Sequence, residues 1–314
     1  MGTGHPYTRG VPPTKTGVFA GTAADNQGNF AAQDWVLFVS VSVIWGASFL
    51  LIAESLEAFT PGMVTLLRVG LGAVTLWGLR LLTNRGRRIE PQDRARVAAV
   101  GIIWVAVPFT LFPLAQQWIN SAVTGLLNGA TPVLVALVSA FLVRVVPHGR
   151  QLIGLGIGFV GIVFISLGSA AEGASQAKGV ALVLLATVCY GFAMNMAPPL
   201  QAKYGAVVLM SAVLTVATVC VVPYAMVNLG NNDPSPQPIL AILVLGAVGT
   251  GFAYWIMMTL VGRVGSIRAS VITYLIPVVA LALGVLIRQD SVNELALIGT
   301  PVTILGAVLS SRRA

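Results

Sequence analysis

The sequence predicts an all-α polytopic membrane protein of ten transmembrane helices, arranged as two inverted five-helix repeats. Three observations lead to this prediction. The 314-residue chain is 56% hydrophobic and only 9% charged, whereas about a quarter of the residues of a soluble protein are charged. Its Lys and Arg residues gather in alternate connections between apolar stretches, and its two halves match in register. Together these features indicate repeated crossings of a lipid bilayer.

Ten apolar stretches account for most of the chain. One helical crossing of a bilayer core about 30 Å thick needs about 20 mostly apolar residues. Short connections rich in Pro, Gly or Asn separate the stretches and leave no room for a second soluble domain. Residues 1–33 lack an apolar core, and we expect them to form a disordered cytoplasmic tail. The expected spans are residues 34–53, 62–82, 97–117, 121–143, 150–168, 179–198, 206–228, 238–260, 268–288 and 295–311.

The distribution of Lys and Arg supports this number of crossings. Cytoplasmic loops carry the excess of basic residues. When the connections are assigned to alternate sides, only Lys178 and Arg288 fall on one side, and Arg68 lies within the second span. We therefore predict a multi-pass protein of the inner (plasma) membrane with both termini in the cytoplasm. The cytoplasmic side collects Arg9, Lys15, Arg80, Arg85, Arg87, Arg88, Arg94, Arg96, Arg144, Arg150, Lys203, Arg263, Arg268, Arg312 and Arg313.

The two halves of the chain match when each residue is set against the one 145 positions later. Five crossings, an odd number, reverse the side on which the second half begins, so the repeats are predicted to be inverted. We expect the first repeat at residues 34–168 and the second at residues 179–311, with a binding site near mid-membrane between them. The coincidences include Trp45-Gly46 with Tyr190-Gly191, Gly101 with Gly246, Phe109 with Tyr254, Pro132-Val133 with Pro277-Val278, and Gly161 with Gly306.

Polar side chains recur on one face of the fourth span. Ser121, Thr124, Asn128 and Thr131 follow each other at intervals of three and four residues and end beside Pro132. Buried polar groups in lipid are costly and usually face protein or a water-filled cavity. A proline also frees a backbone carbonyl one turn earlier, so we expect a kink and a binding position here. The alternative is that these groups only join helices or bond their own backbone.

The ninth span repeats this arrangement. Thr273 and Tyr274 follow Ser270 and precede Pro277, the second expected kink. The same two interpretations apply, and hydrogen bonding within or between helices is the simpler one for Ser270 and Thr273.

Aromatic residues are candidates for the walls of a cavity. Trp45 and Tyr190 match across the halves and lie at mid-span, where anchoring at the membrane interface does not explain them. Phe109 and Tyr254 form a second pair, and Trp104 lies nearby in the third span. The alternative is that these rings serve only as packing.

Arg68 is the only Lys, Arg, Asp or Glu expected inside a span and away from its ends. A charge at that depth needs a partner. Arg binds carboxylate and phosphate groups bidentately, so a substrate could supply the partner. Alternatively, Arg68 snorkels outward to Glu54 or Glu57, or bonds the backbone of a kinked helix.

The sequence lacks the motifs of several other classes of protein. No phosphate-binding loop, metalloprotease motif or paired Cys ligands occur, so we expect neither an enzyme nor a metal or cofactor site. The basic residues behind the net charge of +8 lie in short loops rather than along one face of the protein, which argues against nucleic-acid binding.

No carboxylate is expected at mid-membrane, so we hypothesise facilitated transport or exchange rather than proton coupling. Gly154 and Gly158 predict close packing of the fifth span, within the chain or across a homodimer.

These features together resemble the EamA type of the drug/metabolite transporter superfamily, over residues 34–311. The resemblance implies a fold of two five-helix repeats and an exporter-like carrier of amino acids, drugs or similar metabolites. The chain departs from the family pattern at Ala53, where a lysine is frequent, and at Val143-Arg144 and Arg288-Gln289-Asp290, which replace an acidic signature. The resemblance rests on Trp45-Gly46-Ala47-Ser48-Phe49, Arg68, Thr131-Pro132, the glycines from Gly154 to Gly168, and residues 274–280.

We therefore predict a transporter that binds its substrate in a cavity between the repeats. This cavity is exposed alternately to each side of the membrane. Its partners are the lipid bilayer and a small-molecule substrate. The competing interpretation is a membrane scaffold or sensor that transports nothing. The expected substrate-binding residues are Trp45, Ser48, Arg68, Trp104, Asn128, Thr131, Tyr190, Asn195, Tyr254, Thr273 and Tyr274.

Overall fold

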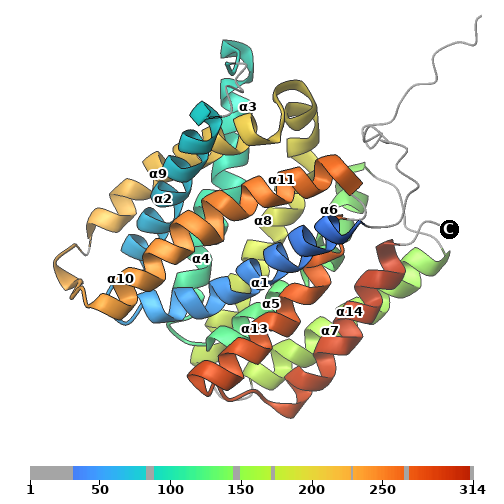
Figure 1. Cartoon of the computed structure of the whole chain (residues 1–314). Helices are drawn as coiled ribbons and strands as arrows, with labels where there is room; N and C mark the ends of the chain where they lie inside the picture. The colour runs from blue at the N-terminus through green and yellow to red at the C-terminus, as the bar shows by residue number, and fades with distance from the viewer. Residues whose placement is uncertain are drawn as a thin grey trace, which may run out of the picture.

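The protein is helical throughout the residues that its structure, a computed structural model, describes (Figure 1). These are residues 31–82, 88–143, 149–170, 174–227, 229–264 and 269–311, and none of them forms a β-strand. Nearly all of the predicted N-terminal tail lies outside the described residues, as do the basic residues Arg9, Lys15, Arg85, Arg87, Arg144, Arg268, Arg312 and Arg313.

The first half of the chain begins with two unbroken helices and continues with two interrupted ones. The third rod contains a π-helical segment, η2, and the fourth is divided between Asn128 and Thr131. The elements are α1 (Ala32–Ser55), α2 (Pro61–Leu82), η1 (Pro91–Asp93), α3 (Arg94–Gly101), η2 (Ile102–Ala106), α4 (Val107–Ala115), α5 (Ser121–Asn128), α6 (Thr131–Val143) and α7 (Gly149–Ala170).

The second half has a similar order of elements. A π-helical segment again interrupts its third rod, at η4. The elements are α8 (Ala174–Tyr204), α9 (Ala206–Val227), η3 (Leu229–Asn231), α10 (Pro236–Leu243), η4 (Val244–Phe252), α11 (Ala253–Val264), α13 (Ile272–Arg288) and α14 (Glu294–Ser311).

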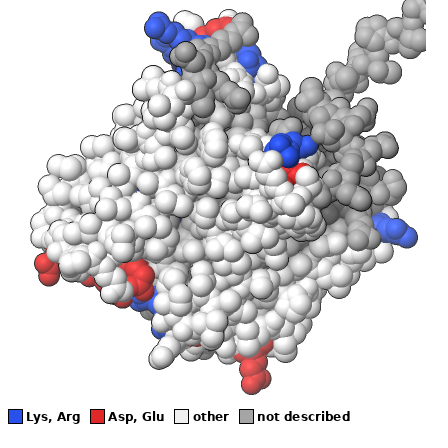
Figure 2. Space-filling view, in the orientation of Figure 1, with Lys and Arg blue, Asp and Glu red and all other residues white. Residues whose placement is uncertain are grey.

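Eight of the described helical rods are long and apolar enough to cross a membrane. Two more apolar helices, α13 and α14, are shorter. Large apolar side chains cover the outside: Val74, Phe141 and Leu286 are each more than 70% exposed. Figure 2 shows a broad band free of charged side chains, with Lys, Arg, Asp and Glu at its edges. Such a surface suits lipid rather than water, and the chain is a multi-pass membrane protein.

Helices of the two halves pack against each other reciprocally. α1 contacts α10, η4 and α11, and α8, the first helix of the second half, contacts α4 and η2. α2 packs against α9, α5 against α13, and α6 against α8. The cavity described below lies among these crossings.

The most extensive contact joins α7 to α14, which lie side by side in Figure 1. Gly154 and Gly158 on α7 approach the backbone of α14 near Gly306, and Gly161 approaches Thr303. A Cβ atom at Gly154 would lie 2.8 Å from the Gly306 carbonyl oxygen, so glycine is required for this approach. The glycine motif is therefore used in packing within the chain.

The prolines that were expected to kink two helices differ in their roles. Pro132 stands in the first turn of α6, where its missing N–H costs no helical hydrogen bond. The fourth rod is therefore broken before Pro132 rather than kinked at it. Pro277 is buried inside α13, one turn after Thr273.

Candidate functional site

A cavity of about 130 Å³ lies between the two halves of the chain. Its wall comes from α1, α2, η2, α4, α5, α6, α8, α11 and α13, so both halves contribute. The lining residues are Trp45, Ser48, Phe49, Arg68, Trp104, Phe109, Phe112, Asn128, Thr131, Tyr190, Met194, Tyr254, Thr273 and Ile276.

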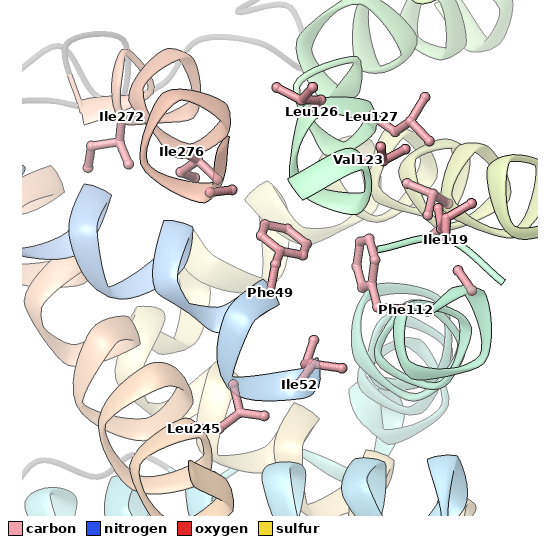
Figure 3. Close-up of a cluster of buried hydrophobic side chains, with 14 of the residues drawn as sticks. Phe49, Ile52, Phe112, Ile119, Val123, Leu126, Leu127, Leu245, Ile272 and Ile276 are labelled. Atoms are coloured by element: carbon pink, nitrogen blue, oxygen red, sulfur yellow. The ribbon is translucent and has the colours of Figure 1, made fainter. Parts of the chain in front are cut away.

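Aromatic rings form much of this wall. Trp45 and Tyr254 meet edge to face, with ring centroids 5.7 Å apart, and thereby join α1 to α11. Phe49 and Phe112 make a second such contact at 5.6 Å, which Figure 3 shows at the meeting of α1 and α4. Phe112 also approaches Tyr190 of α8 at 6.1 Å. Contacts of this geometry stabilise a fixed arrangement of rings, so the wall has a defined shape.

Arg68 brings the only formal charge of the lining residues into the cavity. Its side chain comes from α2 and is only 6% exposed. The guanidinium lies 4.0 Å from the centre of the Phe109 ring, and its Nε donates to the Thr250 hydroxyl at 3.3 Å. The cation–π contact and the hydrogen bond hold the side chain in place without neutralising it. No carboxylate of the described residues pairs with Arg68.

The predicted outward snorkelling of Arg68 to Glu54 or Glu57 is wrong. Both carboxylates pair instead with Arg288 at the end of α13, at 2.7 Å and 2.9 Å. Arg288 reaches them because α13 packs along α1 and both helices end on the same side. Arg68 stays inward, where the Phe109 ring and Thr250 contact it.

The polar face of the fourth rod divides at the helix break. Asn128 and Thr131 line the cavity, and the Thr131 hydroxyl donates to the Asn128 carbonyl oxygen at 2.7 Å. This bond satisfies a carbonyl that the break and Pro132 leave without a helical partner. Ser121 and Thr124 lie nearer the helix start, where Ser121 donates to the Asp290 carboxylate at 2.5 Å. Only the part of the stripe next to the break faces the cavity.

Comparison with known protein families shows which family contains this chain. The sequence model described as the EamA-like transporter family matches residues 35–167 and again residues 177–312. The chain belongs to the EamA-like transporter family.

Relatives of this EamA-like protein carry the same general description. An uncharacterized transporter of Archaeoglobus fulgidus is 26% identical over 90% of this chain and 99% of its own length. The uncharacterized inner membrane transporter YedA of Escherichia coli is 24% identical over 85% of this chain and 87% of its own. A protein of known crystal structure superposes with a TM-score of 0.65 at 19% identity, covering 90% of this chain and 97% of that one. Family and relatives indicate a membrane transporter.

Within this EamA-like fold, nine of the eleven expected residues line the cavity. The two exceptions are Asn195 and Tyr274, whose polar groups bond to backbone. Asn195 donates to the Gly191 carbonyl of its own helix at 2.8 Å, and the Tyr274 hydroxyl donates to the Ala307 carbonyl of α14 at 3.1 Å. Both therefore follow the structural alternative for polar groups inside a span.

Four lining residues were not expected from the sequence: Phe49, Phe112, Met194 and Ile276. The 145-residue register contains a signal for Ile276, whose partner Thr131 was expected, whereas Phe49 and Met194 are partners of each other. Met194 lies 145 positions after Phe49, and Ile276 lies 145 positions after Thr131. The pairs Trp45–Tyr190, Phe109–Tyr254 and Asn128–Thr273 have the same spacing, so ten of the fourteen lining residues occur as matched pairs.

The described residues offer no group of three His, Cys, Asp or Glu side chains that could hold a metal ion. Cys189 and Cys220 are free thiols. The chemistry of the cavity therefore rests on aromatic rings, hydroxyls, an amide and one guanidinium.

Proposed function

We propose that this protein carries small metabolites across the cell membrane by alternating access, with the cavity as the substrate site. In this proposal α13 and α14 complete ten crossings, and both termini lie in the cytoplasm. Arg80, Arg88, Lys203 and Arg263 in the described residues lie at helix ends that this topology assigns to the cytoplasm, in agreement with the distribution of basic residues. Export is favoured over import by the family resemblance alone.

The reciprocal packing of the halves supports an inverted repeat. When helix i of one half contacts helix j of the other, helix j of the first half contacts helix i of the second, as in the pair α1 with α11 and α4 with α8. Such reciprocity is expected of two copies related by a twofold axis. A site on that axis can be exposed to either side when one repeat rocks against the other.

The observation that carries the proposal is the matched lining of the cavity. Five residues of the first half and the five residues 145 positions later face the same space. A scaffold or sensor would need neither a cavity at this place nor unpaired polar groups around it. The volume of about 130 Å³ is below the roughly 300–1,000 Å³ typical of sites for drug-sized ligands, which favours compact metabolites.

The test is transport by the purified protein. A thermal-shift screen of the detergent-purified protein against amino acids, organic acids, nucleosides and cationic drugs identifies stabilising solutes, because a ligand of the folded state raises apparent stability. Proteoliposomes are then assayed for exchange of each labelled hit.

Two variants separate a cavity effect from damage to the fold. Asn128→Trp fills the cavity and is expected to abolish exchange, whereas Val74→Trp, on the lipid-facing side of α2, is expected to retain it. The proposal fails if no solute exchanges faster than in protein-free liposomes, or if Asn128→Trp is as active as Val74→Trp.

A further inference from the structure

We propose that the substrate of the cavity is a small organic monoanion whose carboxylate binds Arg68, with an apolar or aromatic body that packs against the ring wall. This inference deepens the proposed function and rests on it, because it names the class of solute that the carrier takes. Three independent observations support it: a charge without a counter-ion, a surplus of hydrogen-bond donors, and the break in the twofold match at Arg68.

The first observation is the unpaired charge of Arg68. The side chain is more than nine-tenths buried and lines the cavity, and its Nε donates to Thr250. Its two terminal nitrogens make no hydrogen bond with any described residue. Burying an unpaired cation is expensive, and a carboxylate that accepts two parallel N–H bonds compensates the cost. The planar end of Arg68 is therefore available for a bidentate contact with a ligand.

The second observation concerns the other polar groups of the wall. The indole N–H groups of Trp45 and Trp104 and the hydroxyls of Tyr190 and Tyr254 make no hydrogen bond within the described residues. The side-chain amide nitrogen of Asn128 is likewise without an acceptor. An indole N–H can only donate, and a tyrosine hydroxyl can donate. A ligand with acceptor oxygens satisfies the two indole N–H groups and the Asn128 amide nitrogen, which an ammonium group, itself only a donor, leaves without acceptors.

The third observation is that the match between the halves fails at Arg68. The residue 145 positions later is Val213, which is completely buried and packs in the apolar core beside Leu214 and Ala217. The cavity thus has one cationic side and no second basic group among its lining residues. One guanidinium balances one carboxylate, and a phosphate monoester would bring a second negative charge that no lining residue meets.

The rest of the wall determines what the remainder of the ligand looks like. Phe109 lies on the guanidinium of Arg68, and the rings of Trp45, Tyr254 and Phe112 complete the apolar side of the cavity. These rings favour a flat or branched hydrocarbon body. Compact aromatic or branched-chain carboxylic acids combine the two requirements.

The test measures the sign of the charge that the cavity attracts, without knowledge of the natural substrate. Cys189 and Cys220 are replaced by alanine, and a single cysteine is introduced by Asn128→Cys or, in the other half, by Thr273→Cys. Two methanethiosulfonate reagents of similar size are applied, the anionic sulfonatoethyl and the cationic trimethylammonioethyl compound. Each rate is normalised to the rate with a free thiol in solution.

A buried positive charge should favour the anionic reagent. The normalised ratio of anionic to cationic rates is expected to reach about ten, because one nearby charge changes each local concentration by about threefold in opposite directions. Arg68→Gln should return the ratio to near one, and Arg68→Lys, which keeps the charge, should preserve it. The Arg68→Lys variant and the parent protein decide the question even if Arg68→Gln does not fold.

The outcomes separate this inference from the proposed function. If neither introduced cysteine reacts with either reagent, no solvent reaches the cavity and the carrier proposal fails. If both react without an anionic preference, or if Arg68→Gln leaves the preference unchanged, the carrier proposal stands and the carboxylate inference is refuted. In the thermal-shift screen, stabilisation by benzoate but not by benzamide supports the inference, and hits confined to cationic or neutral solutes overturn it.

Discussion

Replacing Gly306 by alanine tests whether the backbone contact between α7 and α14 stabilises the fold. A Cβ atom at position 306 would collide with the backbone nitrogen and Cα of Gly158 and would lie 2.6 Å from the Gly154 carbonyl oxygen. The obstacles are backbone atoms of a helix, which cannot rotate away as a side chain can. The helices must therefore separate.

The expected loss follows from two opposing contributions. Overpacking costs about 1–3 kcal/mol, and a clash with backbone belongs at the upper end of that range. Alanine is the better helix former by about 1 kcal/mol, which offsets part of this loss. The net destabilisation is about 2 kcal/mol, and at about 2 °C per kcal/mol for a chain of this size the apparent Tm should fall by about 4 °C.

The matched control is Gly156→Ala, on α7 but on its open side. A Cβ atom at position 156 meets nothing within 4 Å. Only the gain in helix propensity remains, so the Tm should stay constant or rise by about 2 °C. Both variants are measured by the thermal unfolding of the detergent-purified protein, followed by tryptophan fluorescence. If Gly306→Ala and Gly156→Ala have the same Tm, the inferred role of the glycine contact is wrong.

Three further predictions address the ion pairs and the cavity. Arg288→Gln releases Glu54, in the last turn of α1, and Glu57, just after it, so a cysteine introduced in the cavity should become about fivefold more reactive to an impermeant reagent added outside. Unchanged reactivity would show that these ion pairs do not close this end of the cavity. Asp93→Asn weakens the bonds that Lys203 and Tyr204 donate to this side chain and should lower the apparent Tm of thermal unfolding, whereas a Tm like that of the parent would contradict this expectation. Trp45→Ala should lower exchange at least about tenfold in proteoliposomes, a loss of about 1.4 kcal/mol, and Trp77→Ala, outside the cavity, should not.

The sequence predicts the helices better than it predicts their interruptions. Hydropathy located the apolar rods because their length and composition reflect the thickness of the bilayer core. It did not reveal the π-helical segments η2 and η4 or the division between α5 and α6. A π-helical segment differs from an α-helix in which carbonyl each backbone N–H bonds. An apolar sequence does not indicate which of these two hydrogen-bond patterns forms.

The end of the sixth span illustrates a related error. The span was predicted to end at residue 198, yet α8 continues through Pro198 and Pro199 to Tyr204. Lys203 and Tyr204 both bond to the Asp93 carboxylate, at 2.7 Å and 2.5 Å. This contact with the start of the third rod holds the last turns of α8, and it is made by residues 110 positions apart. Local sequence does not contain that information.

The cavity was predictable where its residues are polar or aromatic at mid-span. Trp45 and Asn128 were identified because an apolar span has little other use for them. Phe112 and Ile276 were not identified because the same residue types fill the hydrophobic core between many of the helices. Asn195 was expected from polarity alone, but its own helix supplies its acceptor.

The glycine-faced pair α7 and α14 contributes no residue to the wall of the cavity. In the proposed function, the residues that select the substrate therefore lie apart from the closest backbone packing of the chain. Substitutions in the lining residues of the cavity therefore do not replace any of the glycines in this backbone-to-backbone seam. A designer who wishes to redirect the carrier should vary the helices around Arg68 and leave the seam alone.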